Sequence, residues 1–292
     1  MIDFILLSIY LIIVALSSIQ LEAFFTLAQA GHFTRAAERL HVTQSALSQR
    51  ILNLEAELET TLFIRERQGV RLTQEGLELL RYCQAKNGLE VEFLSRLKSK
   101  SPKTLMGRIR LGGFSSILHS LLVPSLAQLL KEQVGIRLYC LAREVYELPN
   151  LLQRGEVDYI ALDYKWEREG IVSLLLGHEQ NVLVERKGYR GPEVYIDHDE
   201  KDEMTAKYFR QQKKKWSGER HFLDDIHGLV EGVRNGLGRA LLPRHLIEED
   251  SDFKIIDPGT TLQIPVYLHF YEQPYYSRLH EAALGALRSV KF

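Results

Sequence analysis

The chain has 292 residues, 45% of them hydrophobic and 26% charged, a composition typical of a globular protein with about two domains; it excludes wholesale disorder, collagen and a coiled-coil rod. Its 37 Lys and Arg are balanced by 38 Asp and Glu, which excludes a polycationic protein that coats nucleic acid by bulk charge. Two widely separated cysteines, Cys83 and Cys140, form neither a disulfide framework nor a CxxC metal or redox site. We therefore expect a cytoplasmic protein.

An apolar run, FILLSIYLIIVAL, occupies residues 4–16. It is shorter than the roughly 20 apolar residues of a membrane span, and Asp3 stands where a signal peptide carries Lys or Arg. Three interpretations of residues 1–18 stay open. They are residues added by an upstream start codon, a helix packed on the body or on a partner subunit, or a membrane anchor.

Apolar residues recur at helical spacing from Ile19 to Leu58, interrupted at Gly31-His32 and at residues 41–43. Thr34 comes shortly after the first interruption and Thr43 ends the second, and we expect both to cap helices. Residues 33–51 therefore have the spacing of two helices that meet across a three-residue turn. An ordinary helical hairpin with a polar outer face has the same spacing.

Two short strands, residues 62–64 and 70–72, are predicted to flank a turn that contains Gly69, which makes a wing. A long amphipathic helix follows from about Gln74 to Ser99, after a capping Thr73. Residues 99–103, with the letters SKSPK, break this helix, and we place a domain boundary there.

Beyond Leu105 the pattern alternates between strands and helices, which predicts a parallel sheet with helices on both faces and a ligand site at the carboxyl ends of its strands. The expected strands are residues 108–111, 136–141, 157–163, 182–185, 194–197, 240–242 and 266–270, with helices at 116–132 and 146–154.

The second helix of the predicted pair has a buried stripe of Leu47, Ile51 and Leu54, which leaves amides and hydroxyls on its opposite face. Such groups hydrogen-bond base edges in the major groove, while the arginines of the wing suit phosphates or a minor groove. The candidate DNA-contacting residues are Thr34, Thr43, Gln44, Ser45, Ser48, Gln49, Arg50, Arg65, Arg67 and Arg71.

Residues 19–81 closely resemble the winged helix-turn-helix of LysR-type transcriptional regulators, on the letters LEAFFTLAQAGHFTRAAERLHVTQSALSQRILNLEAEL and LFIRERQGVRLTQEG. The resemblance continues in residues 106–112, 151–158 and 233–243. One departure is Gln49, where the family often has Arg; the basic residue here is the neighbouring Arg50. A non-enzymatic regulator without a cofactor is therefore expected.

The resemblance implies an α+β/α multidomain fold. It consists of an N-terminal winged helix-turn-helix (residues 19–73), a dimerising linker helix and hinge (74–104), and a C-terminal α/β effector domain (105–292) similar to periplasmic binding proteins. Subdomain I of that domain would hold about 107–163 plus 269–292, and subdomain II about 164–268. The implied partners are double-stranded operator DNA, a small-molecule effector, further copies of the chain in a dimer or tetramer, and RNA polymerase.

A loop of Gly112-Gly113-Phe114-Ser115-Ser116 follows a strand and opens a helix, which places two hydroxyls and free amides where a carboxylate is favoured. The resemblance supports an effector at this loop. Alternatively, Ser116 is only an N-cap and the glycines only permit a tight turn. The candidate effector-binding residues are Ser115, Ser116, Arg143, Glu144, Asp163, Asp197 and His198.

Residues 196–204 and 44–51 also resemble the branch of the family that regulates basic amino-acid export. This resemblance implies lysine or arginine as the effector, with its carboxylate on Ser115 and Ser116 and its cation near Glu144 or Asp197. Simple capping or surface charge explains the same carboxylates equally well. The histidines lack a metal-binding spacing, and no catalytic triad or carboxylate pair is recognisable.

Two alternatives to a regulator stay open. One is a membrane-tethered sensor that uses the first eighteen residues. The other is a solute-binding module whose helical head mainly dimerises.

Overall fold

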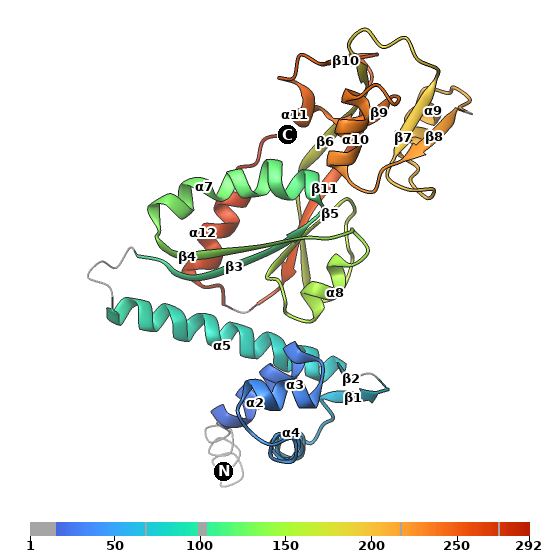
Figure 1. Ribbon diagram of the computed structural model, residues 1–292. Helices are drawn as coiled ribbons and strands as arrows, with labels where there is room; N and C mark the ends of the chain where they lie inside the picture. Colours follow the sequence, from blue (N-terminus) through green and yellow to red (C-terminus); the bar gives the residue numbers. More distant parts are fainter. Residues whose placement is uncertain (1–15, 68, 99–103, 217, 274) are drawn as a thin grey trace, which may run out of the picture. The chain divides into compact units, whose positions relative to one another are not determined.

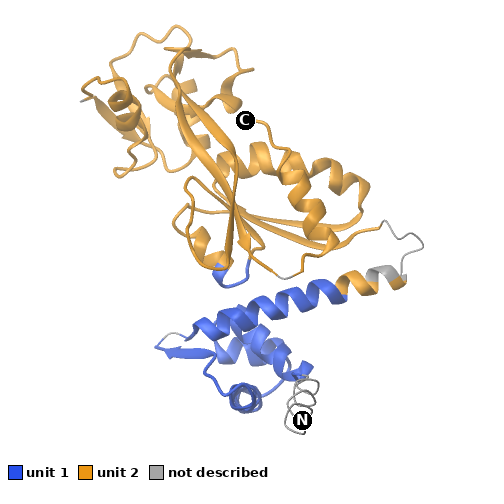
Figure 2. Ribbon diagram, turned by 180° about the vertical axis from the view of Figure 1, so that it is seen from behind, with its two compact units in different colours: residues 1–90, 153–156 blue, residues 91–152, 157–292 orange. Residues whose placement is uncertain are grey.

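The computed structural model describes residues 16–67, 69–98, 104–216, 218–273 and 275–292 (Figure 1). They fall into two compact units: unit 1 up to residue 90 with 153–156, and unit 2 with 91–152 and 157–292 (Figure 2). Residues 4–15 of the apolar run lie outside the described residues. The three interpretations of residues 1–18 therefore stay untested. Among the helices that are described, none combines the length and the apolar character needed to cross a membrane.

Unit 1 is a helical module with a two-stranded wing. Its core is formed by large side chains that are fully buried, including Phe24, Leu27, Leu47 and Leu54. The elements are α2 (Ser18–Ala30), α3 (Phe33–Arg39), α4 (Gln44–Glu57), the antiparallel strands β1 (Phe63–Glu66) and β2 (Gly69–Leu72), and the first part of α5 (Gln74–Lys98). The predicted helix pair, the wing and the long helix are confirmed.

The helix starts follow the predicted capping chemistry at two of three positions. Thr43 accepts a hydrogen bond from the amide of Ala46 at 3.2 Å, and Thr73 accepts one from the amide of Gly76 at 2.9 Å. The prediction for Thr34 is wrong, because α3 begins at Phe33 after an extended His32, which places Thr34 inside the helix.

The wing packs on the turn after α2 through Gly69. Its backbone has φ of 133°, a conformation that favours glycine, and a Cβ built there would lie 2.3 Å from the carbonyl oxygen of Gly31. The next residue, Val70, donates its amide to that same carbonyl at 2.8 Å.

We expect Gly69→Ala to lower the free energy of unfolding of unit 1 by about 1–3 kcal/mol, because backbone strain and the lost hydrogen bond add. Thermal unfolding followed by circular dichroism measures this change. Gly88→Ala is the matched control, since a Cβ there meets nothing within 4 Å. Equal stability of the two variants would contradict the assigned role of Gly69.

Unit 2 is built on a seven-stranded mixed sheet in the order β10-β6-β11-β5-β3-β4, with β9 also paired to β6. The strands are β3 (Met106–Gly113), β4 (Gly135–Ala142), β5 (Tyr159–Leu162), β6 (Ile171–Arg186), β9 (Ala240–Pro243), β10 (Phe253–Ile255) and β11 (Leu262–Tyr271). Within this sheet only β3, β4 and β5 pair in parallel with one another, so the prediction of a parallel sheet is wrong for β6, β9 and β11. The chain leaves the β3–β4–β5 region along β6 and returns along β11, which makes these two strands antiparallel.

Strand β6 is much longer than the predicted 182–185. Its first part pairs with β11, and its last part pairs with β9 and β10. The register against β11 slips between Val266 and Tyr267, whose partners are Gly177 and Leu175, so Leu176 is an extra residue on β6. Figure 1 shows β6 and β11 running together between the two halves of the unit.

Most of the remaining elements pack on this sheet, whereas the strands at 194–197 and 219–222 pair in parallel as a separate two-stranded sheet. One hydrophobic core lies between β3, β5, β11 and the helices α7 and α12, and a second lies between the end of β6, β9 and α10. The elements are α6 (Ser115–Ile117), a π-helical turn η1 (Leu118–Leu122), α7 (Val123–Glu132), α8 (Leu148–Gln153), β7 (Val194–Asp197), α9 (Met204–Gln211), β8 (Glu219–Phe222), α10 (Ile226–Arg234), α11 (Arg244–Ile247) and α12 (Arg278–Leu287).

Candidate functional site

The second helix of the pair, α4, has one buried face and one polar face. Leu47, Ile51 and Leu54 are at most 3% exposed and hold the helix against α2. On the other side, Thr43, Gln44, Ser45 and Gln49 are exposed, and Ser48 and Arg50 are half-buried. The stripe predicted from the sequence therefore turns these amides and hydroxyls outward together.

Several of these polar groups are paired with one another. The Gln49 side-chain amide donates to Asn53 Oδ1 at 2.8 Å, and the hydroxyls of Thr43 and Ser45 lie 3.0 Å apart. Thr34 donates to Gln44 Oε1 at 3.4 Å. These exposed bonds are weak in water, so base edges or phosphates can replace them at low cost.

The wing presents three exposed arginines. The guanidinium of Arg65 stacks over the ring of Phe33 at 5.2 Å, which orients it beside the start of α3. Arg71 forms an exposed ion pair with Glu66 at 2.9 Å, and such a pair adds little stability. Arg67 lies at the tip of the hairpin.

In unit 2, a second set of polar side chains meets around Glu179 on β6. Ser116 from α6 donates its hydroxyl to Glu179 Oε1 at 3.1 Å, and Asn181 donates to Oε2 at 3.4 Å. His245 from α11 places its Nε2 atom 3.9 Å from Oε1. We call Ser116, Glu179, Asn181 and His245 the Glu179 cluster. The interpretation of Ser116 as an N-cap is wrong, because its hydroxyl bonds to Glu179 and Phe114 occupies the cap position.

Burial dominates the electrostatics of this cluster. It raises the pKa of Glu179 to about 7. The hydrogen bonds from Ser116 and Asn181 lower the pKa, and the nearby Asp163 raises it slightly. Burial also lowers the pKa of His245, although a hydrogen bond to the backbone of Ser116 opposes this. The His245 ring is therefore a neutral neighbour near neutral pH.

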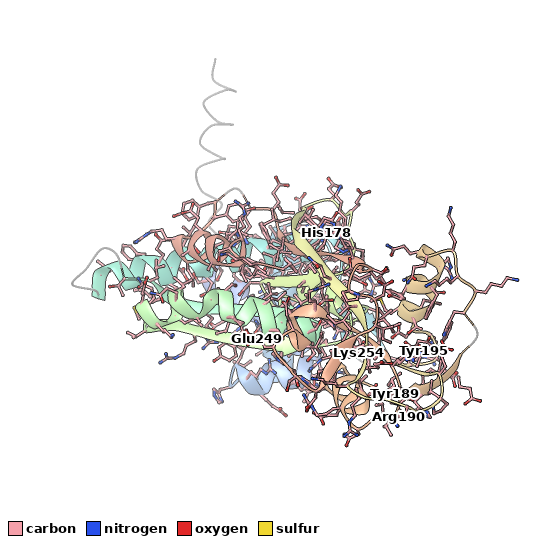
Figure 3. All side chains as sticks on the ribbon, turned by 90° about the horizontal axis from the view of Figure 1, so that it is seen from above. His178, Tyr189, Arg190, Tyr195, Glu249 and Lys254 are labelled. Carbon is pink, nitrogen blue, oxygen red and sulfur yellow. The ribbon has the colours of Figure 1, made fainter. Side chains whose placement is uncertain are left out.

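Two other buried carboxylates in unit 2 have cationic partners. Glu185, six residues along β6, pairs with Arg239 at 3.1 Å and Lys254 at 3.0 Å. Asp197 pairs with Arg220 at 2.6 Å and accepts a hydrogen bond from Thr205. Among the described residues, no Lys or Arg forms an ion pair with Glu179. Figure 3 labels Lys254, a partner of Glu185, and His178, the neighbour of Glu179, at separate places in the view.

The predicted effector residues divide into two groups. Ser116 belongs to the Glu179 cluster, Ser115 is the adjacent first residue of α6, and Asp163 interacts with Glu179 electrostatically. The others make local contacts instead: Arg143 donates to the carbonyl of Ala142, the amide of Glu144 donates to Glu147, Asp197 is paired with Arg220, and the amide of His198 donates to Asp202.

Sequence reasoning missed Glu179 and His245. The signal for Glu179 was weak, because the polar letters GHEQN at residues 177–181 do not indicate a strand in which one carboxylate is buried and needs a partner. His245 had no such signal, since only the fold brings α11 to Ser116.

A winged helix-turn-helix with a polar recognition face, followed in the same chain by an α/β unit with a buried charged cluster, defines a ligand-responsive DNA-binding regulator. Residues 19–77 match the family of bacterial regulatory helix-turn-helix proteins of the lysR type, and residues 102–291 match the LysR substrate binding domain. The chain belongs to the LysR family and is a DNA-binding transcriptional regulator with an effector-binding domain.

Individual relatives agree with this assignment. The chain is 31% identical over 202 residues to the HTH-type transcriptional regulator HdfR of Yersinia enterocolitica, covering 69% of this chain and 67% of that protein. The match to HdfR of Yersinia pestis, at 32% identity, spans about half of either protein, with 54% of this chain and 53% of that one.

Solved structures share the fold across nearly the whole chain. ArgP from Mycobacterium tuberculosis is similar with a TM-score of 0.76 at 22% identity, covering 94% of this chain and 97% of that one. Full-length LysG from Corynebacterium glutamicum with bound effector Arg has a TM-score of 0.71 at 19% identity and the same coverage.

Proposed function

We propose that this regulator responds to a small molecule with a positively charged group, lysine or arginine, received at the Glu179 cluster. The observation that carries the proposal is the buried Glu179 carboxyl, which has no Lys or Arg partner among the described residues, whereas Glu185 and Asp197 do. Ionising a buried carboxyl without a counter-charge is costly, so a ligand cation that supplies this charge gains a strong electrostatic interaction with the carboxylate.

The neighbouring groups suit the rest of an amino acid. Ser115 is half-buried at the start of α6, where its hydroxyl and the adjacent amides favour the ligand's carboxylate. Asp163 is exposed and adds negative potential on the side of the cation. Asp197 is left out of this site, because a ligand cation would have to displace Arg220. LysG of Corynebacterium glutamicum, which shares the fold, carries arginine as its effector, and this supports arginine as the first ligand to test.

We propose further that the exposed face of α4 reads base edges while the wing arginines hold phosphates or a minor groove. Two copies of the chain would present two such surfaces, and effective concentration would then offset the modest charge of each. The effector would act by favouring one arrangement of the assembly on operator DNA and thereby change access of RNA polymerase.

Calorimetric titration tests the effector assignment. We expect arginine or lysine to release or absorb heat and to raise the melting temperature, while citrulline, the neutral analogue of arginine, binds at least about tenfold more weakly. Glu179→Gln keeps an oxygen for Ser116 but removes the charge, so it should weaken arginine binding by about ten- to a thousandfold.

The matched control is Glu169→Gln, which removes an exposed carboxylate of the same unit and should bind arginine as the parent does. The proposal fails if neither amino acid binds, or if Glu179→Gln binds the cationic ligand as tightly as the parent.

A further inference from the structure

Glu179 is enclosed by groups that do not supply a positive charge. Its pairing partner across the sheet is Ile264 on β11, and Ser116 and Asn181 are neutral donors. His245 on α11 faces Glu179, and its Nε2 atom is buried and has no hydrogen-bond partner among the described residues. The Glu179 side chain is 5% exposed, and the described residues that donate hydrogen bonds to it are neutral.

The other titratable groups nearby are acidic, exposed or engaged elsewhere. Asp163, after the end of β5, acts on Glu179 as a like charge, and Lys207 of α9 acts on Asp163. His178, next to Glu179 on β6, is exposed, and Arg244 of α11 donates to the carbonyl of Pro258. None of these contacts favours an ionised Glu179 in the ligand-free chain.

We infer that the cationic effector enters the Glu179 cluster in exchange for a proton, so that binding is coupled to proton release from the Glu179 carboxyl. The inference rests on the proposed function and adds its regulation by pH. The O–H bond of the carboxylic acid breaks, the proton leaves to solvent, and the carboxylate accepts a charge-assisted hydrogen bond from the ligand's ammonium or guanidinium group.

The direction of the pH effect follows from the site. Because the pKa of Glu179 is about 7, the ligand-free carboxyl is largely protonated at pH 6 and largely ionised at pH 8. A cation binds the ionised form, so affinity rises with pH through this window and then levels off. We expect the dissociation constant for arginine to be about tenfold larger at pH 6 than at pH 8.

Titration calorimetry in two buffers of different ionisation enthalpy measures the proton directly. At pH 7 we expect roughly half a proton to be released for each arginine bound, and almost none near pH 9. Glu179→Gln should show weaker binding with no dependence on the buffer. His245→Gln separates the two titratable neighbours, because it should still release the proton if Glu179 is the source.

Infrared spectroscopy of the ligand-free chain gives a second readout. A protonated buried carboxyl has its own stretching band, which should disappear as the pH rises through about 7 and should be missing in Glu179→Gln.

The outcomes are distinguishable. Arginine binding with equal heats in both buffers, together with no titrating carboxyl band, overturns the proton exchange and leaves the proposed function standing. The absence of binding by arginine and lysine overturns the proposed function and the exchange that depends on it. Proton release that is lost in His245→Gln and kept in Glu179→Gln also overturns the assignment.

Discussion

Replacing Arg220 with methionine is expected to destabilise unit 2 by about 3–5 kcal/mol, because it leaves Asp197 buried without its counter-charge. The Asp197 side chain is 3% exposed and that of Arg220 is 20% exposed, so solvent cannot take over the role of the guanidinium. The same guanidinium donates to the carbonyls of Asp199 and Asp202 and lies 4.8 Å from the ring centroid of Phe222. All these contacts are lost together.

The loss should depend on pH. Burial already raises the pKa of Asp197 above its usual value despite Arg220, and removing the guanidinium raises it further. A carboxyl whose folded-state pKa is raised contributes stability that is present at low pH and lost as the pH rises through that pKa. The variant should therefore be closer to the parent in stability at pH 5 than at pH 8.

Tryptophan fluorescence in a urea titration measures this effect, because both tryptophans of the chain, Trp166 and Trp216, lie in unit 2. Arg168→Met is the matched control, since it removes an exposed arginine that only stacks over Trp166. If Arg220→Met unfolds at the same urea concentration as this control, Asp197 is not held by an ion pair, and its exclusion from the effector site has to be reconsidered.

The second large effect concerns operator recognition. We expect Gln44→Ala to lower the preference for the gene's own upstream DNA over a random duplex by roughly five- to a hundredfold, the typical value of one base contact. Arg65→Gln should instead weaken binding to both duplexes alike and reduce the salt dependence, because phosphate contacts carry no sequence information.

Fluorescence anisotropy over a salt series distinguishes these two behaviours. Gln211→Ala, an exposed glutamine of α9 in unit 2, is the control for the amide change. Unchanged binding of both duplexes by Gln44→Ala and Arg65→Gln would show that α4 and the wing are not the DNA-contacting surface.

The outward polar face of α4, the proposed DNA-contacting surface, could be predicted from sequence because it is local. The buried stripe of Leu47, Ile51 and Leu54 fixes which side of α4 faces outward, and all these positions lie within one turn or two of each other. Thr34 was the exception. The extended backbone of His32 starts α3 earlier than the threonine pattern indicates, and boundaries are set by such details.

The Glu179 cluster could be predicted only in part because its members are far apart in the chain. Ser116 was found from its loop, but Glu179 lies 63 residues later and reaches Ser116 only through the sheet. The polar letters GHEQN at residues 177–181 obscured the long strand β6, whose backbone is satisfied by pairing with β11. From the sequence, Asp197 is expected in the effector site, whereas in the structure it pairs with Arg220. No local sequence pattern indicates this pairing, because the two residues are 23 positions apart.

The extra residue Leu176 marks a point where β6 bends and twists more than a regular strand. A bulged residue is left out of the regular pairing, so the strand changes direction there. Glu179 lies three residues from this point, and the segment paired with β9 begins two residues further on, at Asn181. The bend at Leu176 therefore helps to set the direction in which β6 presents Glu179 and continues towards β9.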